Sequence, residues 1–166
     1  MKTTTTKRQW QAIYRLLDRV SPVPYDCGKL CGSACCTVSG EHPDEEMGIY
    51  LYPADHWLSW TAEPAEDYEF PDSWNGDVYF VRCQDPPHCP RHKRPLQCRT
   101  YPLAPRLTDE GVLILIKNDE NLPYTCPLIV NDMELSDDFI RATYTVWSHL
   151  IRDPFIYDLI LMDSQK

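Results

Sequence analysis

The sequence has no long apolar run. Its longest stretch of this kind, residues 112–116, has the length of a β-strand, whereas a membrane-spanning helix needs roughly 18 apolar residues. Residues 1–8 carry positive charge, but no apolar segment or small-residue cleavage site follows them, as it would in a secretory signal. We therefore expect a cytoplasmic location and no membrane interaction.

The chain also has few glycines and lacks the common catalytic motifs. Its six glycines form neither G-x-G-x-x-G nor G-x-x-x-x-G-K, the loops that cradle nucleotide phosphates. The sequence also lacks H-E-x-x-H, the motif of many zinc peptidases, and G-x-S-x-G, the motif of α/β-hydrolases. These absences disfavour an enzyme, and the sequence offers no catalytic residue.

Positive charge is in deficit. Sixteen Lys and Arg stand against 25 Asp and Glu, which gives a formal charge of −9. This sign opposes docking on a phosphate backbone, so nucleic acid is not an expected partner. A protein partner and the oligomeric state are left open.

Helical patterns lie at both ends of the chain. Residues 7–20 place Trp10, Ile13 and Leu17 at helical spacing behind a threonine run that can supply an N-cap. Ser136 can cap a helix and Asp153 the next, which predicts C-terminal helices over 136–163. The buried stripe expected in this last region is Phe139, Ile140, Tyr144, Trp147 and Ile151.

The centre predicts short strands among irregular segments. Strands are expected at 48–52 and 78–81, a helix at 53–60, a turn at Asn75-Gly76 and a hairpin over 106–117. We therefore predict a single α+β domain, residues 1–166, with short antiparallel strands, N-terminal and C-terminal helices, and a cysteine-rich metal-binding centre. Fifteen prolines make this centre irregular but stiff, and a metal crosslink can offset its limited apolar burial.

Eight cysteines are the most informative residues. The first group is C-x3-C-x3-C-C, the second is C-x5-C-x8-C, and one cysteine follows. Structural zinc sites use thiolates two to four residues apart, and a cytosolic chain keeps its thiols reduced. We expect all eight to be candidate ligands of zinc or of an iron–sulfur cluster: Cys27, Cys31, Cys35, Cys36, Cys83, Cys89, Cys98 and Cys126.

Alternatives accompany this interpretation. Buried inert thiols are the simplest other explanation, and adjacent Cys35 and Cys36 seldom both reach one ion. His88 and His92 lie beside Cys89, but a surface position or a supporting role is expected for each. The basic stretch 82–106 either lowers the thiol pKa values or pairs with the acidic segment 41–77.

Two segments resemble the YkgJ family of small bacterial cysteine-cluster proteins. They are residues 27–36 and residues 94–102 (RPLQCRTYP), which are similar to the family's "RP..CR.YP" stretch. The resemblance covers roughly residues 25–130 and implies a zinc- or iron-chelating domain, with Cys27, Cys31, Cys35, Cys36 and Cys98 as ligands. Three residues separate Cys31 from Cys35, where family members often have two.

A similar cysteine cluster occurs in flagellin lysine methylases, and this resemblance implies an iron–sulfur cluster and methyl transfer. The expected function is therefore metal binding through thiolates. An iron–sulfur redox protein, or part of a protein-modifying enzyme system, is the alternative.

Overall fold

The computed structural model describes residues 2–36, 48–55, 63–64, 70–74, 78–83, 88–118 and 124–166. Residues 53–55 form a turn, and the remainder of the helix expected at 53–60 lies outside the described residues. The predicted Asn75-Gly76 turn lies outside them too.

The N-terminal helix, α1 (Lys7–Leu17), begins where the threonine run predicts. Thr6 and Gln9 form a capping box, in which each side chain bonds the backbone N–H of the other residue. Trp10, Ile13 and Leu17 are buried, as their spacing predicts. The helix ends three residues before the expected boundary at 20, because the chain turns at residues 18–19.

Two helices close the chain, α5 (Asp137–Leu150) and α6 (Pro154–Ser164). Ser136 and Asp153 cap them by accepting hydrogen bonds from backbone N–H groups, as predicted. The Asp153 carboxylate also accepts from the Thr3 hydroxyl at 2.5 Å and the Thr4 N–H at 2.7 Å. This carboxylate therefore joins the start of the chain to its last helix.

The predicted buried stripe of α5 was wrong at two positions. Ile140 and Tyr144 are 38% and 47% exposed. The buried positions repeat every three or four residues from Phe139, so a side chain one residue further along is rotated by about 100°. The buried residues are Phe139, Ala142, Thr143, Val146, Trp147 and Leu150.

The strands form two small antiparallel sheets. In the first, β3 (Tyr79–Arg82) lies between β1 (Gly48–Tyr50) and β2 (Glu63–Pro64), with Gly48 opposite Arg82. In the second, β4 (Leu103–Leu107) pairs with β5 (Leu113–Lys117), and Gly111 turns the hairpin with φ +75°. The strands predicted at 48–52 and 78–81 and the hairpin at 106–117 are present with shifted ends.

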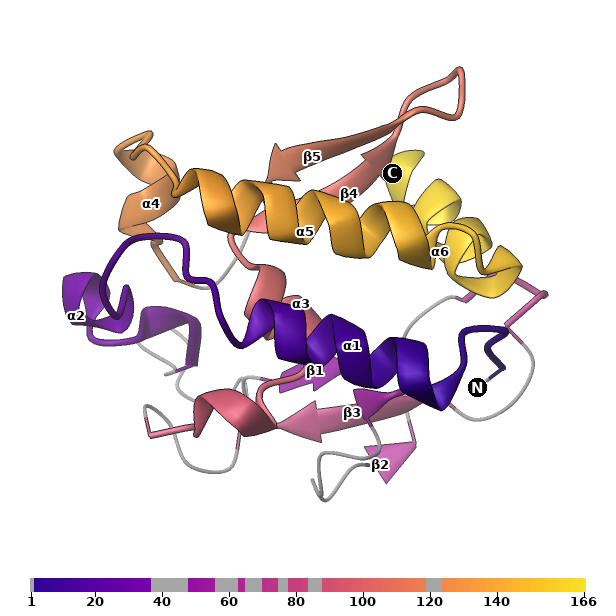
Figure 1. Cartoon of the computed structure of the whole chain (residues 1–166), viewed down its shortest axis with the longest axis horizontal. Coiled ribbons are helices and arrows are strands. Elements are labelled where there is room, and N and C mark those ends of the chain that lie inside the picture. The colour runs from indigo at the N-terminus through magenta and orange to yellow at the C-terminus, as the bar shows by residue number, and fades with distance from the viewer. Residues whose placement is uncertain are drawn as a thin grey trace.

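The elements pack as helices between two sheets. Figure 1 shows α5 between α1 and the β4–β5 hairpin, with the three-stranded sheet drawn beyond α1. The main core contains Trp10, Leu96, Trp147 and Ile156, each almost fully buried. The mixed helical and antiparallel architecture of a small domain is thus confirmed. Among the described residues, no helix combines the length and apolar character needed to cross a bilayer.

The segments between these elements wind into very short helices. They are α2 (Gly28–Cys31), η1 (Ala34–Cys36), η3 (Arg91–Lys93), α3 (Leu96–Thr100) and α4 (Pro127–Val130). Helices of three to five residues have little stability by themselves. Tertiary contacts must therefore hold them in place.

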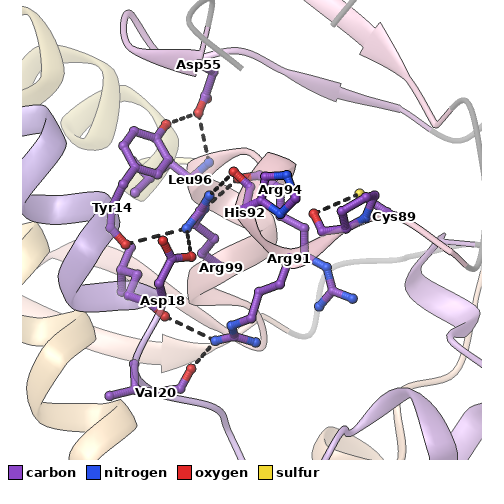
Figure 2. A network of polar contacts seen from close by, with 12 residues as sticks. Tyr14, Asp18, Val20, Asp55, Cys89, Arg91, His92, Arg94, Leu96 and Arg99 are labelled. Atoms are coloured by element: carbon purple, nitrogen blue, oxygen red, sulfur yellow. Dashed lines mark hydrogen bonds and ion pairs between the residues drawn. The ribbon is translucent and has the colours of Figure 1, made fainter. Parts of the chain in front are cut away.

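Arg99 of α3 supplies one group of these contacts. Its side chain is almost fully buried and donates to the carbonyl oxygens of Arg94 at 2.6 Å and His92 at 2.8 Å. It also pairs with Asp18, and its guanidinium lies 4.6 Å from the centre of the Tyr14 ring. Figure 2 shows how these contacts join η3 and α3 to the end of α1.

Asp55 supplies a second group. Its fully buried carboxylate accepts hydrogen bonds from the Tyr52 N–H at 2.8 Å, the Leu96 N–H at 3.0 Å and the Tyr14 hydroxyl (Figure 2). Burial raises the pKa of Asp55 to about 6, although these hydrogen bonds act in the opposite direction. One carboxylate thereby ties α1, the segment after β1 and the start of α3.

Replacing Arg99 tests its role in the fold. We expect Arg99→Met to lower the free energy of unfolding by about 3 kcal/mol, because Asp18 and three carbonyl groups lose their donor. Arg141→Met is the control, since Arg141 is 69% exposed and water screens its pairing with Asp138, so this substitution should change the free energy of unfolding little. Urea unfolding measures both, and equal losses would contradict the assignment.

The raised pKa of Asp55 predicts a pH dependence. The folded state holds the proton more tightly than the unfolded state, whose Asp pKa is near 3.8. This contribution to stability is largest at low pH and is lost as the pH rises through about 6. Between pH 5 and 7.5 the metal-free wild type should lose about 1 kcal/mol of unfolding free energy relative to Asp55→Asn. Urea unfolding at several pH values measures this difference. If the free energy of unfolding changes equally with pH in the two proteins, the prediction is wrong.

Candidate metal centre

All eight cysteines lie in the described part of the chain, and no disulfide links them. Cys35 and Cys83 are exposed, whereas the other six are half-buried. All eight lie on or next to short elements. In the first group, Cys27 and Cys31 lie at the two ends of α2, and Cys35 and Cys36 lie in η1. Among the others, Cys83 follows β3, Cys89 precedes η3, Cys98 lies within α3, and Cys126 is the N-cap residue of α4.

Cys98 is the point at which the first and second cysteine groups meet. Burial raises the pKa of the Cys98 thiol, and the nearby thiols of Cys36 and Cys83 raise it further. Cys89 acts on Cys98 in the same direction. Burial, Cys36 and Cys89 together raise the pKa of Cys83 to about 11. The thiols of Cys36, Cys83, Cys89 and Cys98 are therefore close enough for their charges to act on one another.

The remaining thiols border this group. Burial raises the pKa of Cys27, and Asp26, Cys126 and Cys31 add to the effect. Cys35 adjoins both Cys27 and Cys98, whose charges raise its pKa. Each of the eight thus lies close to at least one other cysteine, although they come from distant parts of the sequence.

Cys35 and Cys36 have sulfurs only 3.9 Å apart. Two ligands of a tetrahedral zinc ion, each about 2.3 Å from the metal, would be about 3.8 Å apart. The Cys36 thiolate accepts a hydrogen bond from the Cys35 thiol, which lowers the pKa of Cys36 to about 6 and raises that of Cys35. Although Cys35 and Cys36 are adjacent in the chain, their sulfurs are therefore close enough to bind the same zinc ion.

Glycines shape the turn that carries the first group. Gly32 ends α2 with φ +62°, a left-handed conformation that favours glycine. A Cβ on Gly28 would lie 2.4 Å from the Ser33 Oγ, so the close approach of Ser33 to α2 requires glycine there. Both glycines directly follow a cysteine, and their freedom allows the four thiols to share one short turn.

The thiols are not closed around a single ion. Within the described residues, no three His, Cys, Asp or Glu side chains are placed to hold one metal ion. His88 and His92 are exposed, in agreement with the surface position expected for them. The structure brings the eight predicted residues into one region, and their role as ligands stays a prediction.

Arginines of the basic stretch serve different purposes. Arg94 lowers the pKa of both Cys27 and Cys36 through its positive charge. Arg91 and Arg99 instead donate to backbone carbonyls, and Arg99 pairs with Asp18. Asp18 lies outside the acidic segment 41–77, most of which is outside the described residues. The charge of Arg94 thus opposes the burial that raises the pKa of Cys27 and adds to the Cys35 hydrogen bond that lowers the pKa of Cys36. Both expected uses of the basic stretch stay predictions.

Sequence reasoning missed two tyrosines. Tyr101 and Tyr124 meet edge to face with ring centres 6.1 Å apart. Burial raises the pKa of Tyr101, and the neighbouring Cys126 and Tyr124 add to this effect. Tyr101 belongs to the RPLQCRTYP segment, three residues after Cys98, and this spacing was the available signal.

A cavity of about 520 Å³ adjoins Cys27. Its walls include Arg91 and Arg94 on one segment and Asp18 and Asp26 on others. A buried metal site needs a path for the ion, and this cavity supplies one to Cys27.

No protein-family model, curated protein or solved structure matches this chain. The resemblance to the YkgJ family therefore rests on residues 27–36 and 94–102 alone.

The hydrogen bond between Cys35 and Cys36 makes a testable prediction. At pH 7, iodoacetamide should alkylate Cys36 of the metal-free protein at least roughly tenfold faster than Cys83, because Cys36 is mostly thiolate there. Peptide mass spectrometry over time measures both rates. Cys35→Ala removes the donor and should slow the labelling of Cys36. Faster labelling of the more exposed Cys83 would show that the interpretation is wrong.

Proposed function

We propose that this chain is a metal-binding protein whose cysteine thiolates hold zinc or an iron–sulfur cluster. One observation carries the proposal: thiols from four separate stretches of the sequence gather in one region without forming a disulfide. Inert core cysteines have no reason to gather in this way. Six of the eight are half-buried rather than buried, and two are exposed.

The chemistry of the region supports a soft metal. Thiolates are the preferred ligands of zinc and of iron–sulfur clusters, and both bind only the deprotonated form. Burial and neighbouring thiols raise the pKa values of Cys27, Cys83 and Cys98, so ionisation of these three thiols is disfavoured in the metal-free protein. A bound cation would remove this penalty, since its charge offsets that of the thiolates.

The proposed ligand set contains all eight thiolates. The resemblance to the YkgJ family favours five of them: Cys27, Cys31, Cys35, Cys36 and Cys98. Cys83, Cys89 and Cys126, which act on the pKa values of these thiols, complete the assignment. Reduced thiols are required for it, which favours the cytoplasm as the location.

The spacing of the thiols bears on the kind of metal. A single zinc ion needs four ligands at mutual distances near 3.8 Å, and among the described residues no three are so placed. In a four-iron cluster each cysteine binds a different iron atom, so the ligands lie further apart than those of one zinc ion. The second candidate function is electron transfer by an iron–sulfur protein, for which eight soft thiolates supply enough ligands.

The metal would also stabilise the fold. Four of the cysteine-bearing elements are helices of three to five residues, and a shared metal would crosslink them. The Arg99 and Asp55 contacts hold α3, but neither reaches α2 or α4. Metal binding is the proposed function, and no catalytic residue is assigned.

Purification without oxygen tests the proposal. The wild type should contain stoichiometric metal, with visible absorbance if iron is bound and none if zinc is bound. Cys36→Ser and Cys98→Ser should each lose most of the metal and melt about 10 °C lower, since a site that binds only the folded state stabilises it. Elemental analysis and thermal melting are the measurements.

Thr100→Val is the matched control, because Thr100 is buried on the same short helix as Cys98 and its hydroxyl bonds only carbonyls of that helix. It should retain the metal. A wild type without metal, or cysteine variants that keep it, would contradict the proposed function.

A further inference from the structure

Two buried hydrogen-bond donors beside the cysteines have no acceptor. The Nε of Arg94 and the hydroxyl of Tyr101 are shielded from solvent, and neither finds a hydrogen-bond partner in the described part of the chain. Buried donors are nearly always paired in native proteins, so each such exception calls for an explanation. Trp10 and Trp147 also have unpaired ring nitrogens, but these lie in the apolar core.

Arg94 is held rigidly next to the first cysteine group. Its backbone N–H donates to the Arg91 carbonyl at 3.1 Å, and its own carbonyl accepts from the Arg99 side chain at 2.6 Å (Figure 2). Its side chain lines the same cavity as Cys27. The backbone is therefore fixed on both sides, while the guanidinium keeps an unused donor near the thiols.

Tyr101 occupies a comparable place near Cys126. Its backbone N–H donates to the Gln97 carbonyl at 2.9 Å, so it is anchored to the end of α3. The Tyr124 ring packs edge-on against its ring, and Tyr124 is two residues from Cys126. Burial, Cys126 and Tyr124 raise the pKa of the hydroxyl, which places it near both side chains. Within the described residues no acceptor meets it at good hydrogen-bonding geometry.

We infer that Arg94 and Tyr101 are positioning residues of the proposed metal centre, donating hydrogen bonds to different sulfur atoms of the cysteine group. This inference rests on the proposed function. Sulfur that ligates a metal carries net negative charge and accepts hydrogen bonds, whereas a neutral thiol accepts them poorly. Arg94 would donate to the sulfur of Cys27 or Cys36, and Tyr101 to the sulfur of Cys126.

If Arg94 and Tyr101 have this role, removing a donor has different effects on the metal-loaded and the metal-free protein. In the metal-loaded protein the donors stabilise the ligated sulfurs, so removing one weakens metal binding. In the metal-free protein the Tyr101 hydroxyl is a buried donor without a partner, so removing it costs nothing. A residue with a purely structural role would lower the stability of both states.

The experiment measures metal retention against a competing chromogenic chelator, and thermal melting of the protein stripped of metal. Arg94→Met and Tyr101→Phe should each weaken metal retention about 10- to 100-fold. Arg94→Lys keeps the charge and should lose less than Arg94→Met. Stripped Tyr101→Phe should melt at the wild-type temperature or above it.

Arg141→Met and Tyr144→Phe are the matched controls, because both side chains are exposed on α5. They should retain metal as the wild type does. Two results would overturn the inference and leave the proposed function intact. One is metal retention equal to that of the wild type in both Arg94→Met and Tyr101→Phe. The other is a lower melting temperature of Tyr101→Phe after its metal has been removed. A wild type that binds no metal refutes the proposed function, and the inference with it.

Discussion

The position of η3 and α3, next to Cys89 and around Cys98, depends on the buried guanidinium of Arg99. A charged group with 3% of its surface exposed must have partners for its donors, and the carbonyls of His92 and Arg94 together with Asp18 supply them. Satisfying one side chain thus fixes the course of η3, the start of α3 and the end of α1. Cys98 lies one residue before Arg99, so its sulfur is placed by the same contacts.

Polar contacts are needed to hold the short helices of the cysteine region in place. Its helices are too short to be stable by themselves, and irregular segments bury little apolar surface. Asp55 adds three hydrogen bonds from Tyr14, Tyr52 and Leu96, which join α3 to two other parts of the chain. The regular helices α1, α5 and α6 supply much of the main apolar core. The thiols lie on or beside the short elements, and Cys27 and Cys126 pack against a second, smaller apolar cluster.

Local signals predicted the regular elements well. Thr6, Ser136 and Asp153 cap their helices as their residue types indicate, and Gly111 turns the hairpin, because each of these features depends on residues close in the sequence. The exposed side of α5 was harder to predict. Ile140 is apolar, yet only the packing of the neighbouring elements decides which flank of a helix is covered.

The sequence by itself determined the chemistry available to this protein: eight thiols, their clustering and an excess of negative charge. It also determined the helices at the two ends, since capping and apolar spacing are local. Only the tertiary structure decided which distant thiols are neighbours, and that Arg94 and Tyr101 present unpaired donors beside them. Those relations depend on contacts between residues far apart in the chain, so residue spacing could at most mark Tyr101 as close to Cys98 and could not show which donors are left unpaired.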